Sequence, residues 1–227
     1  MTEKKELTIR DKCSANIWDY ENAFFWFSHP SRINKTLAHY ELYKSIVDLP
    51  GDIFELGVYK GCSLVRLATF RNLLENDFSR KIVGFDAFGK FPVEQLTLGS
   101  DKDFIEDFEK NGGYGLSRDE ILAIFENKGF KNYNLVKGNI FETIVNYIED
   151  FPATRISFLH LDMDVKEPTI YALEKLYDRV VRNGLIVFDD YATVAGETEA
   201  VDSFLDKYDL KLQKLNNYHI PSYVRKP

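Results

Sequence analysis

The chain has 227 residues and a formal net charge of −7, with 44% hydrophobic and 29% charged residues. This composition is ordinary for a globular chain, and the acidic balance disfavours nucleic acid as a partner, because phosphate binding needs a basic surface. Two cysteines, Cys13 and Cys62, are too few for a disulfide framework. No apolar run reaches the length of a membrane span, and the charged N-terminus lacks a signal-peptide core. We therefore expect a cytoplasmic protein that binds neither membrane nor nucleic acid.

Residues 1–50 are predicted to form an N-terminal arm and a helical cap. Residues 1–15 are polar and expected to be loosely ordered, whereas 31–48 carry apolar residues at helical spacing. Between them lies a dense aromatic stretch formed by Tyr20 and residues 24–27. Two interpretations are equally open: the stretch packs on the core, or it forms a lid or a subunit interface. We expect a homo-oligomer.

Residues 51–227 are predicted to form a single α/β domain, in which short apolar runs alternate with helical patterns. The expected strands are 52–56, 81–85, 133–136, 156–161 and 185–188, with 211–215 and 218–224 pairing as an antiparallel edge. The expected helices are 63–74, most of 101–129, 141–149, 168–181 and 198–207. This alternation predicts a mainly parallel, Rossmann-like sheet with its ligand site at the carboxyl ends of the strands.

A turn containing two glycines follows the first of these strands, in the sequence FELGVYKGCSL. The small residues allow a ligand to approach the backbone, and the next helix points its N-terminus at the same place. The spacing differs from the dinucleotide fingerprint and from a P-loop. Glu55, just before Gly57, suits a cationic ligand such as S-adenosylmethionine, although a plain turn explains the pattern equally well.

Acidic residues follow three further strands. Asp86 ends the second strand, where a carboxylate can accept both hydroxyl hydrogens of an adenosine ribose; capping of the next turn is the alternative. Asp162 follows the fourth strand, and Asp189 and Asp190 follow the fifth. Neighbouring carboxylates favour a hard divalent cation such as Mg²⁺, which lowers the pKa of an acceptor hydroxyl. We expect Asp164, shortly before Pro168, to cap the next helix instead.

Together these segments resemble the macrocin O-methyltransferase family of metal-dependent sugar O-methyltransferases. The matching stretches are FELGVYKGCSL (54–64), VGFDAFGKFP (83–92), LHLDMDVKEPTIYALEKLY (159–177), NGLIVFDDY (183–191) and GETEAVDSFL (196–205). The resemblance implies a class I methyltransferase fold with a seven-stranded sheet, helices on both faces and an N-terminal helical cap. It also implies methyl transfer from S-adenosylmethionine to a sugar hydroxyl of a small-molecule substrate, either a nucleotide-linked deoxysugar or a glycan or natural-product sugar.

The resemblance also assigns roles to individual residues. It implies that Asp162, Asp189 and Asp190 hold Mg²⁺ or a similar divalent cation and that Asp162 is the general base. The implied contacts to S-adenosylmethionine are Glu55, Gly57, Val58, Tyr59, Gly61, Ser63, Asp86, Phe88, Asn139, Ile140 and Asp162. Two other functions stay open, namely methylation of a catechol or other vicinal diol and a non-catalytic binding subunit.

Two regions depart from the family pattern. His160 stands where macrolide-branch members often carry Arg; we expect a core residue, with a substrate contact as the alternative. The insert from about 89 to 131 looks divergent and is expected to be the substrate lid, with Lys90, Lys102, Lys110 and Arg118.

His29, His39 and His219 have no partner motif and are expected to be surface or helix residues. Cys62 is expected to be a small buried residue.

Overall fold

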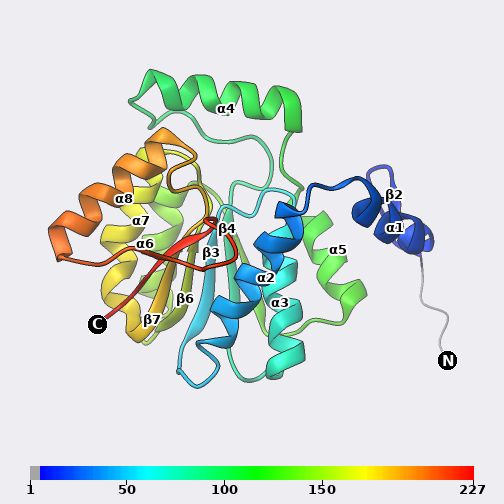
Figure 1. Ribbon diagram of the computed structural model, residues 1–227, viewed down its shortest axis with the longest axis horizontal. Coiled ribbons are helices and arrows are strands. Elements are labelled where there is room, and N and C mark those ends of the chain that lie inside the picture. The colour runs from blue at the N-terminus through cyan, green and yellow to red at the C-terminus, as the bar shows by residue number, and fades with distance from the viewer. Residues whose placement is uncertain (1–5) are drawn as a thin grey trace.

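The computed structural model describes residues 6–227 and has a central seven-stranded sheet, in the order β5-β4-β3-β6-β7-β9-β8 (Figure 1). The first five of these strands are parallel; β9 pairs antiparallel with β7, and β8 pairs antiparallel with β9. The strands are β3 (Asp52–Leu56), β4 (Ile82–Asp86), β5 (Tyr133–Lys137), β6 (Ile156–Leu161), β7 (Val180–Phe188), β8 (Gln213–Lys214) and β9 (Ser222–Arg225). The predicted parallel sheet and its antiparallel edge are confirmed.

Helices cover both faces of the sheet, as predicted (Figure 1). One face carries α2 (Ser31–Lys44), α3 (Cys62–Leu74) and α5 (Arg118–Lys128). The other carries α6 (Ile140–Asp150), α7 (Lys166–Leu176), the short helix η2 (Tyr177–Arg179) and α8 (Ala195–Tyr208). Each face buries its own apolar cluster, so a central strand such as β6 is buried along its whole length and is mostly apolar in sequence. Within residues 6–227 no helix has the length and apolar character needed to cross a bilayer.

The insert is divided into two helices with different roles. The chain leaves α4 (Gly99–Gly112) at Gly113, whose φ of +71° favours glycine, and Ser117 then starts α5 with a capping box. The expectation that the whole range 89–131 is a lid is wrong, because α5 packs into the apolar cluster on the sheet face that also carries α2 and α3. Within the insert, α4 and the loops beside it lie over the carboxyl ends of the strands, whereas α5 does not (Figure 1).

Strand β7 begins earlier than the sequence predicts. Val180 and Val181, expected at the end of a helix, are its first residues, because the helix ends in η2 at Arg179. Val180 pairs with Ile156 of β6 before a register irregularity. The extra strand length is buried at Val180 and then exposed, which explains why its apolar pattern is weak.

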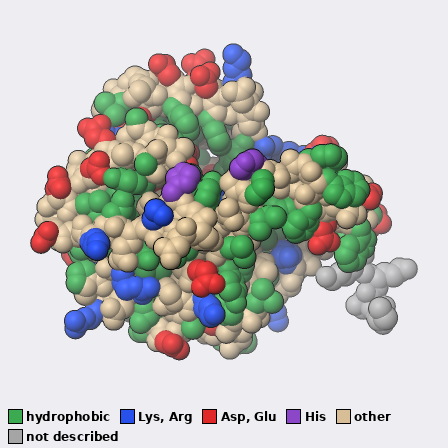
Figure 2. All heavy atoms as spheres, in the orientation of Figure 1, with side chains coloured by type: hydrophobic (Ala, Val, Ile, Leu, Met, Phe, Trp, Pro, Cys, Tyr) green, Lys and Arg blue, Asp and Glu red, His purple; other side chains and the backbone are tan. Residues whose placement is uncertain are grey.

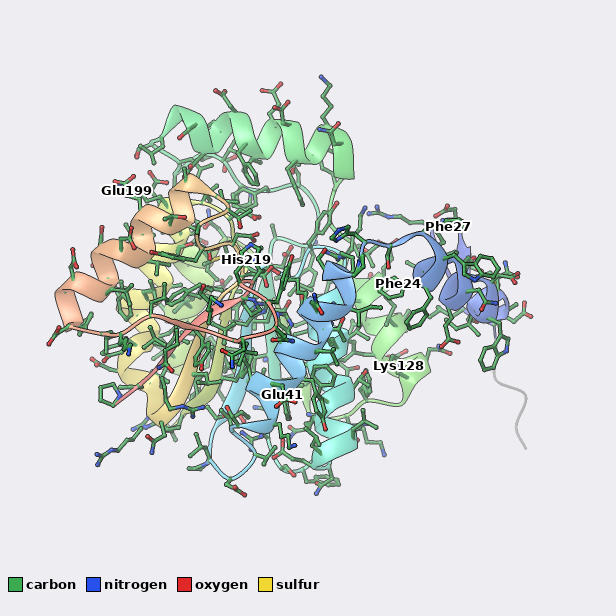
Figure 3. All side chains as sticks on the ribbon, in the orientation of Figure 1. Phe24, Phe27, Glu41, Lys128, Glu199 and His219 are labelled. Carbon is green, nitrogen blue, oxygen red and sulfur yellow. The ribbon has the colours of Figure 1, made fainter. Side chains whose placement is uncertain are left out.

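The N-terminal segment does not pack on the core. Residues 8–13 form a small hairpin of β1 (Thr8–Ile9) and β2 (Lys12–Cys13), followed by η1 (Ser14–Asn16) and α1 (Ile17–Phe27). Helix α1 projects from the body and has no buried residue (Figures 1 and 3). Its aromatic side chains stay in solvent, with Phe27 81% exposed, and they form a hydrophobic area at that end of the molecule (Figure 2). Packing on the core is thereby excluded for the aromatic stretch. Residues 1–5 of the predicted loose arm lie outside the described residues.

Candidate active site

A cavity of about 600 Å³ lies at the carboxyl ends of β3, β4, β6 and β7, where the sheet topology places a ligand site. Helix α4 forms its opposite wall. The cavity brings together the turn after β3, Asp86 after β4, the start of α6 and the acidic residues after β6 and β7. The residues expected to line it that do so are Gly57, Val58, Tyr59, Ser63, Asp86, Asn139, Ile140, Asp162, Asp189 and Asp190.

The turn after β3 is built from backbone in close contact. Gly57 has φ of +90°, and a Cβ atom there would lie 1.9 Å from the backbone oxygen of Asp162. Glycine is therefore the residue type that fits, both for its conformation and for the space. As a result the turn after β3 and the end of β6 are in direct contact.

Asp86 braces this turn from the neighbouring strand. Its Oδ2 accepts hydrogen bonds from the backbone N–H groups of Val58 (2.7 Å) and Tyr59 (2.9 Å), and its Oδ1 accepts one from Phe88 (2.5 Å). Each carboxylate oxygen has further acceptor capacity, so a ribose contact remains compatible with these bonds. The alternative that Asp86 organises a turn is also correct.

Three residues expected to touch the cofactor do not line the cavity. Glu55 is fully buried beneath the turn, where Ser63 Oγ donates to its Oε1, and burial raises its pKa to about 7. Gly61 faces α5, because a Cβ atom there would lie 2.6 Å from Ile121 Cδ1. Phe88 is packed into the apolar cluster on the sheet face that carries α2, α3 and α5. The three residues are near the cavity in sequence, but the side chains of Glu55 and Phe88 pack elsewhere and Gly61 lies against α5.

The predicted carboxylate cluster does form. Asp162, Asp189 and Asp190 each offer a ligand oxygen, and these atoms lie within 4.8 Å of one another. Burial and the Asp189 carboxylate raise the pKa of Asp162 well above its usual value. Grouped carboxylates repel one another, so a nearby cation stabilises them, and an all-oxygen donor set fits Mg²⁺. The residues present therefore fit the predicted metal.

Asp189 differs from its neighbours because positive and hydrogen-donating groups surround it. Lys35 Nζ forms an ion pair with Oδ2, and the Nε2 atoms of His160 and His39 lie 3.3 and 3.5 Å from Oδ1. Although burial acts in the opposite direction, these neighbours hold the pKa of Asp189 well below its usual value. Arg66 donates to His39 Nδ1, so the His39 proton is on Nε2, facing Asp189.

The histidine expectations are confirmed in part. His29 and His219 are exposed, and His160 is a core residue that also contacts Asp189 and lies 3.8 Å from Glu55. His39 does lie on a helix, but it is buried against the site, and burial lowers its pKa to about 4. Cys62 is exposed rather than buried, because it begins α3 at the rim of the cavity. The sequence does not predict Lys35 or His39 as site residues, although their spacing of four residues places them on one helix face.

Asp164 is not a helix cap. The N-cap of α7 is Val165, and the backbone N–H of Lys166 is bonded by Asp101 from α4. Asp164, with φ of +65°, lines the cavity instead, and burial together with the Asp190 carboxylate raises its pKa to about 8. Buried Glu197 accepts the backbone N–H of Asp190 and was also missed, although it lies in the GETEAVDSFL stretch.

The wall that faces the carboxylates is mostly apolar. Helix α4 contributes Phe104, Ile105 and Phe108, and the preceding loop contributes Phe91 and Leu96. Of the four basic residues expected in the lid, only Lys90 lines the cavity. Lys102 and Lys110 are exposed, and Arg118 bonds the backbone of Leu135 instead. The lid therefore offers flat aromatic surface rather than a basic patch.

The fold, the strand order and the position of the cavity define a class I methyltransferase fold. The macrocin-O-methyltransferase (TylF) family profile matches residues 37–221. The chain belongs to this family, which confirms the resemblance.

Two curated relatives come from Streptomyces. One, from Streptomyces olivaceus, is named 8-demethyl-8-(2,3-dimethoxy-alpha-L-rhamnosyl)-tetracenomycin-C 4'-O-methyltransferase and is 27% identical over 71% of this chain. The other, demethyldecarbamoylnovobiocin O-methyltransferase from Streptomyces niveus, is 25% identical over 72% of this chain. The matches span 60% and 61% of the lengths of these relatives.

Solved structures show the same fold. The calicheamicin methyltransferase CalS11 superposes with a TM-score of 0.68 at 25% identity, covering 92% of this chain and 85% of its own. The O-methyltransferase NovP gives a TM-score of 0.74 at 21% identity, covering 86% and 80%. At this identity the second likeness concerns the fold alone.

Proposed function

We propose that this protein transfers the methyl group of S-adenosylmethionine to a hydroxyl group of a sugar carried by a small molecule. The observation that carries this proposal is one cavity bordered by the braced turn after β3 and by the carboxylates after β6 and β7. One part suits a methyl donor and the other suits activation of a hydroxyl. The rhamnosyl group in the name of the Streptomyces olivaceus relative supports a sugar acceptor.

The residues divide into two groups in this proposal. Val58, Tyr59 and Asp86 bind the donor, while Asn139 and Ile140 at the start of α6 lie where its adenine is expected. Asp162, Asp189 and Asp190 would hold Mg²⁺, which lowers the pKa of a bound hydroxyl when present. The aromatic wall of α4 presses the acceptor against this edge and excludes water. The protein thereby aligns the acceptor oxygen with the methyl carbon and the departing sulfur.

Two carboxylates compete for the role of general base. Asp162 is the base implied by the family resemblance, but a carboxylate that binds a cation has lower proton affinity. Asp164 lies outside the three-residue set, lines the same cavity and has a pKa of about 8. A carboxyl with this pKa is mostly protonated at neutral pH, so Asp164 accepts the hydroxyl proton only when it is ionised, a state that a cation bound by the neighbouring carboxylates would favour.

We expect Asp164→Asn to lower turnover by about a hundred-fold or more while Mg²⁺ affinity changes little. Asp162→Asn, in contrast, is expected to weaken Mg²⁺ binding as well as turnover. Single-turnover methyl transfer and calorimetric titration with Mg²⁺ separate the two roles. If Asp164→Asn turned over like the wild type, Asp162 would be the base.

A mass-spectrometric screen tests the proposed function directly. The protein is incubated with S-adenosylmethionine, Mg²⁺ and three acceptor sets: nucleotide-linked deoxysugars, rhamnosylated aromatic natural products and catechols. We expect a gain of one methyl group on a sugar in one of the first two sets and its loss with EDTA. Methylation of catechols alone would contradict the sugar acceptor. Absence of calorimetric binding of S-adenosylmethionine at millimolar concentration would contradict an enzymatic role.

The exposed aromatic residues of α1 support the expected homo-oligomer. Trp18, Trp26 and Phe27 are each at least 70% exposed on a helix with no buried residue, and apolar areas of this kind commonly mark contact surfaces. We expect light scattering to give a mass above the 26.4 kDa of one chain. The double variant Trp26→Ser with Phe27→Ser is expected to give a lower mass by light scattering than the wild type. A monomeric wild type would refute this assembly.

A further inference from the structure

Both oxygens of Asp189 are already engaged in this structure. Lys35 forms an ion pair with Oδ2, whereas His39 and His160 face Oδ1. Two of these three groups come from α2, where Lys35 and His39 are four residues apart and lie on the same helix face. One metal-site carboxylate thus holds the first half of α2 against the end of β7.

Lys35 supplies the positive charge of the carboxylate cluster. Among residues 6–227 it is the one Lys or Arg within 4.0 Å of Asp162, Asp189 or Asp190. Its side chain is 19% exposed and Asp189 is 2% exposed, so the pair is shielded from bulk solvent. A divalent cation at the same carboxylates either binds Asp189 Oδ2, the atom that Lys35 contacts, or lies directly beside the Lys35 ammonium. Either case opposes the Lys35 contact, because like charges at such distances repel strongly in a poorly solvated place.

We propose that the Lys35 ammonium competes with the divalent cation for the carboxylate cluster, and that metal binding displaces Lys35 and releases the first turns of α2. This inference rests on the metal site of the proposed function. Lys35 then has two positions. Paired with Asp189, it offsets part of the negative charge of the cluster before the metal binds; displaced, it lies at the cavity wall that it already lines. Metal loading and the seating of α2 are coupled through this exchange.

The first test compares metal affinity. Mg²⁺ alone is titrated by calorimetry into the full wild-type chain, Lys35→Met and Lys35→Gln. We expect both variants to bind Mg²⁺ about ten-fold tighter, since the competing cation is gone. Lys90→Met is the matched control: it removes the same charge from the same cavity but has no carboxylate partner among the described residues. Equal or weaker binding by both Lys35 variants would overturn the proposal.

The second test observes displacement. Hydrogen exchange of residues 31–44 is measured with and without Mg²⁺, with 118–128 of α5 as the internal reference. In the wild type we expect faster exchange in 31–44 when Mg²⁺ is bound, and in Lys35→Met no further change. Unaltered exchange in the metal-bound wild type would refute displacement. If neither the wild type nor Lys35→Met bound Mg²⁺, the metal site of the proposed function would be wrong. If both bound Mg²⁺ with equal affinity, the metal site would stand and the competition by Lys35 would be wrong.

Discussion

Replacement of both Asp189 and Asp190 by Asn is expected to abolish metal-stimulated methyl transfer, lowering turnover by about a thousand-fold or more. The two substitutions remove two of the three carboxylates grouped within 4.8 Å and leave Asp162 alone. Binding of the donor is expected to survive, because none of the hydrogen bonds that brace the donor turn involves either residue.

The measurement pairs two quantities on the same preparation. Turnover is followed with and without Mg²⁺ on an acceptor found in the screen, and calorimetry gives the Kd of S-adenosylhomocysteine. Asp206→Asn with Asp209→Asn serves as the control, because it removes two exposed charges near the end of α8. Near-normal turnover of the Asp189 and Asp190 double variant would disprove the metal role. Loss of S-adenosylhomocysteine binding would show instead that the cluster supports the donor site.

Replacement of Asp86 by Ala is expected to weaken binding of S-adenosylhomocysteine about a hundred-fold. Three backbone N–H groups, those of Val58, Tyr59 and Phe88, lose their charged acceptor at once. A hydrogen bond to a charged group contributes about 1.5–3 kcal/mol, so the turn loses its shape before any ribose contact is counted. Asp86→Asn keeps one oxygen acceptor and is expected to lie between Ala and the wild type.

Asp52→Ala is the matched control for this change. Asp52 also lies at a strand end and its Oδ1 accepts the backbone N–H of Lys81, but it is at the amino end of β3 and does not line the cavity. It is expected to lower the thermal midpoint without altering the Kd. An unchanged Kd in Asp86→Ala would remove Asp86 from the donor site.

Much of the fold follows from the sequence because the central parallel strands β3, β4 and β6 are buried along nearly their whole length. These strands are mostly apolar in sequence, and the acidic residues at the ends of β4, β6 and β7 are predicted at one edge of the sheet, where the structure has them. The start of β7 was missed, because its exposed residues 182 and 183 interrupt the apolar run. The different roles of α4 and α5 in the insert are only partly predictable, because an amphipathic helix has the same spacing of apolar residues whether it packs on the sheet or lies over the cavity.

The site was less predictable because it depends on side-chain direction and on contacts distant in sequence. Glu55 precedes the donor turn as expected, yet it points beneath it toward His160. The ion pair between Lys35 and Asp189 joins positions 154 residues apart, so no local pattern reveals it. Asp164 precedes a helix and is therefore predicted to cap it, but Asp101 of α4 accepts the backbone N–H of Lys166 instead.

Helix α4 is fastened at both ends. Asp101 in its first turn is buried and bonds the start of α7, while the Gly112 carbonyl at its last turn accepts hydrogen bonds from Tyr59 Oη (2.7 Å) and Lys60 Nζ (2.6 Å) of the donor turn. Between these fastenings, Phe104, Ile105 and Phe108 face the cavity. Changes of size at these three positions alter the room for an acceptor without moving either fastening. For the proposed methyl transfer, the range of acceptors can therefore be altered within one helix while the turn proposed to bind the methyl donor stays unchanged.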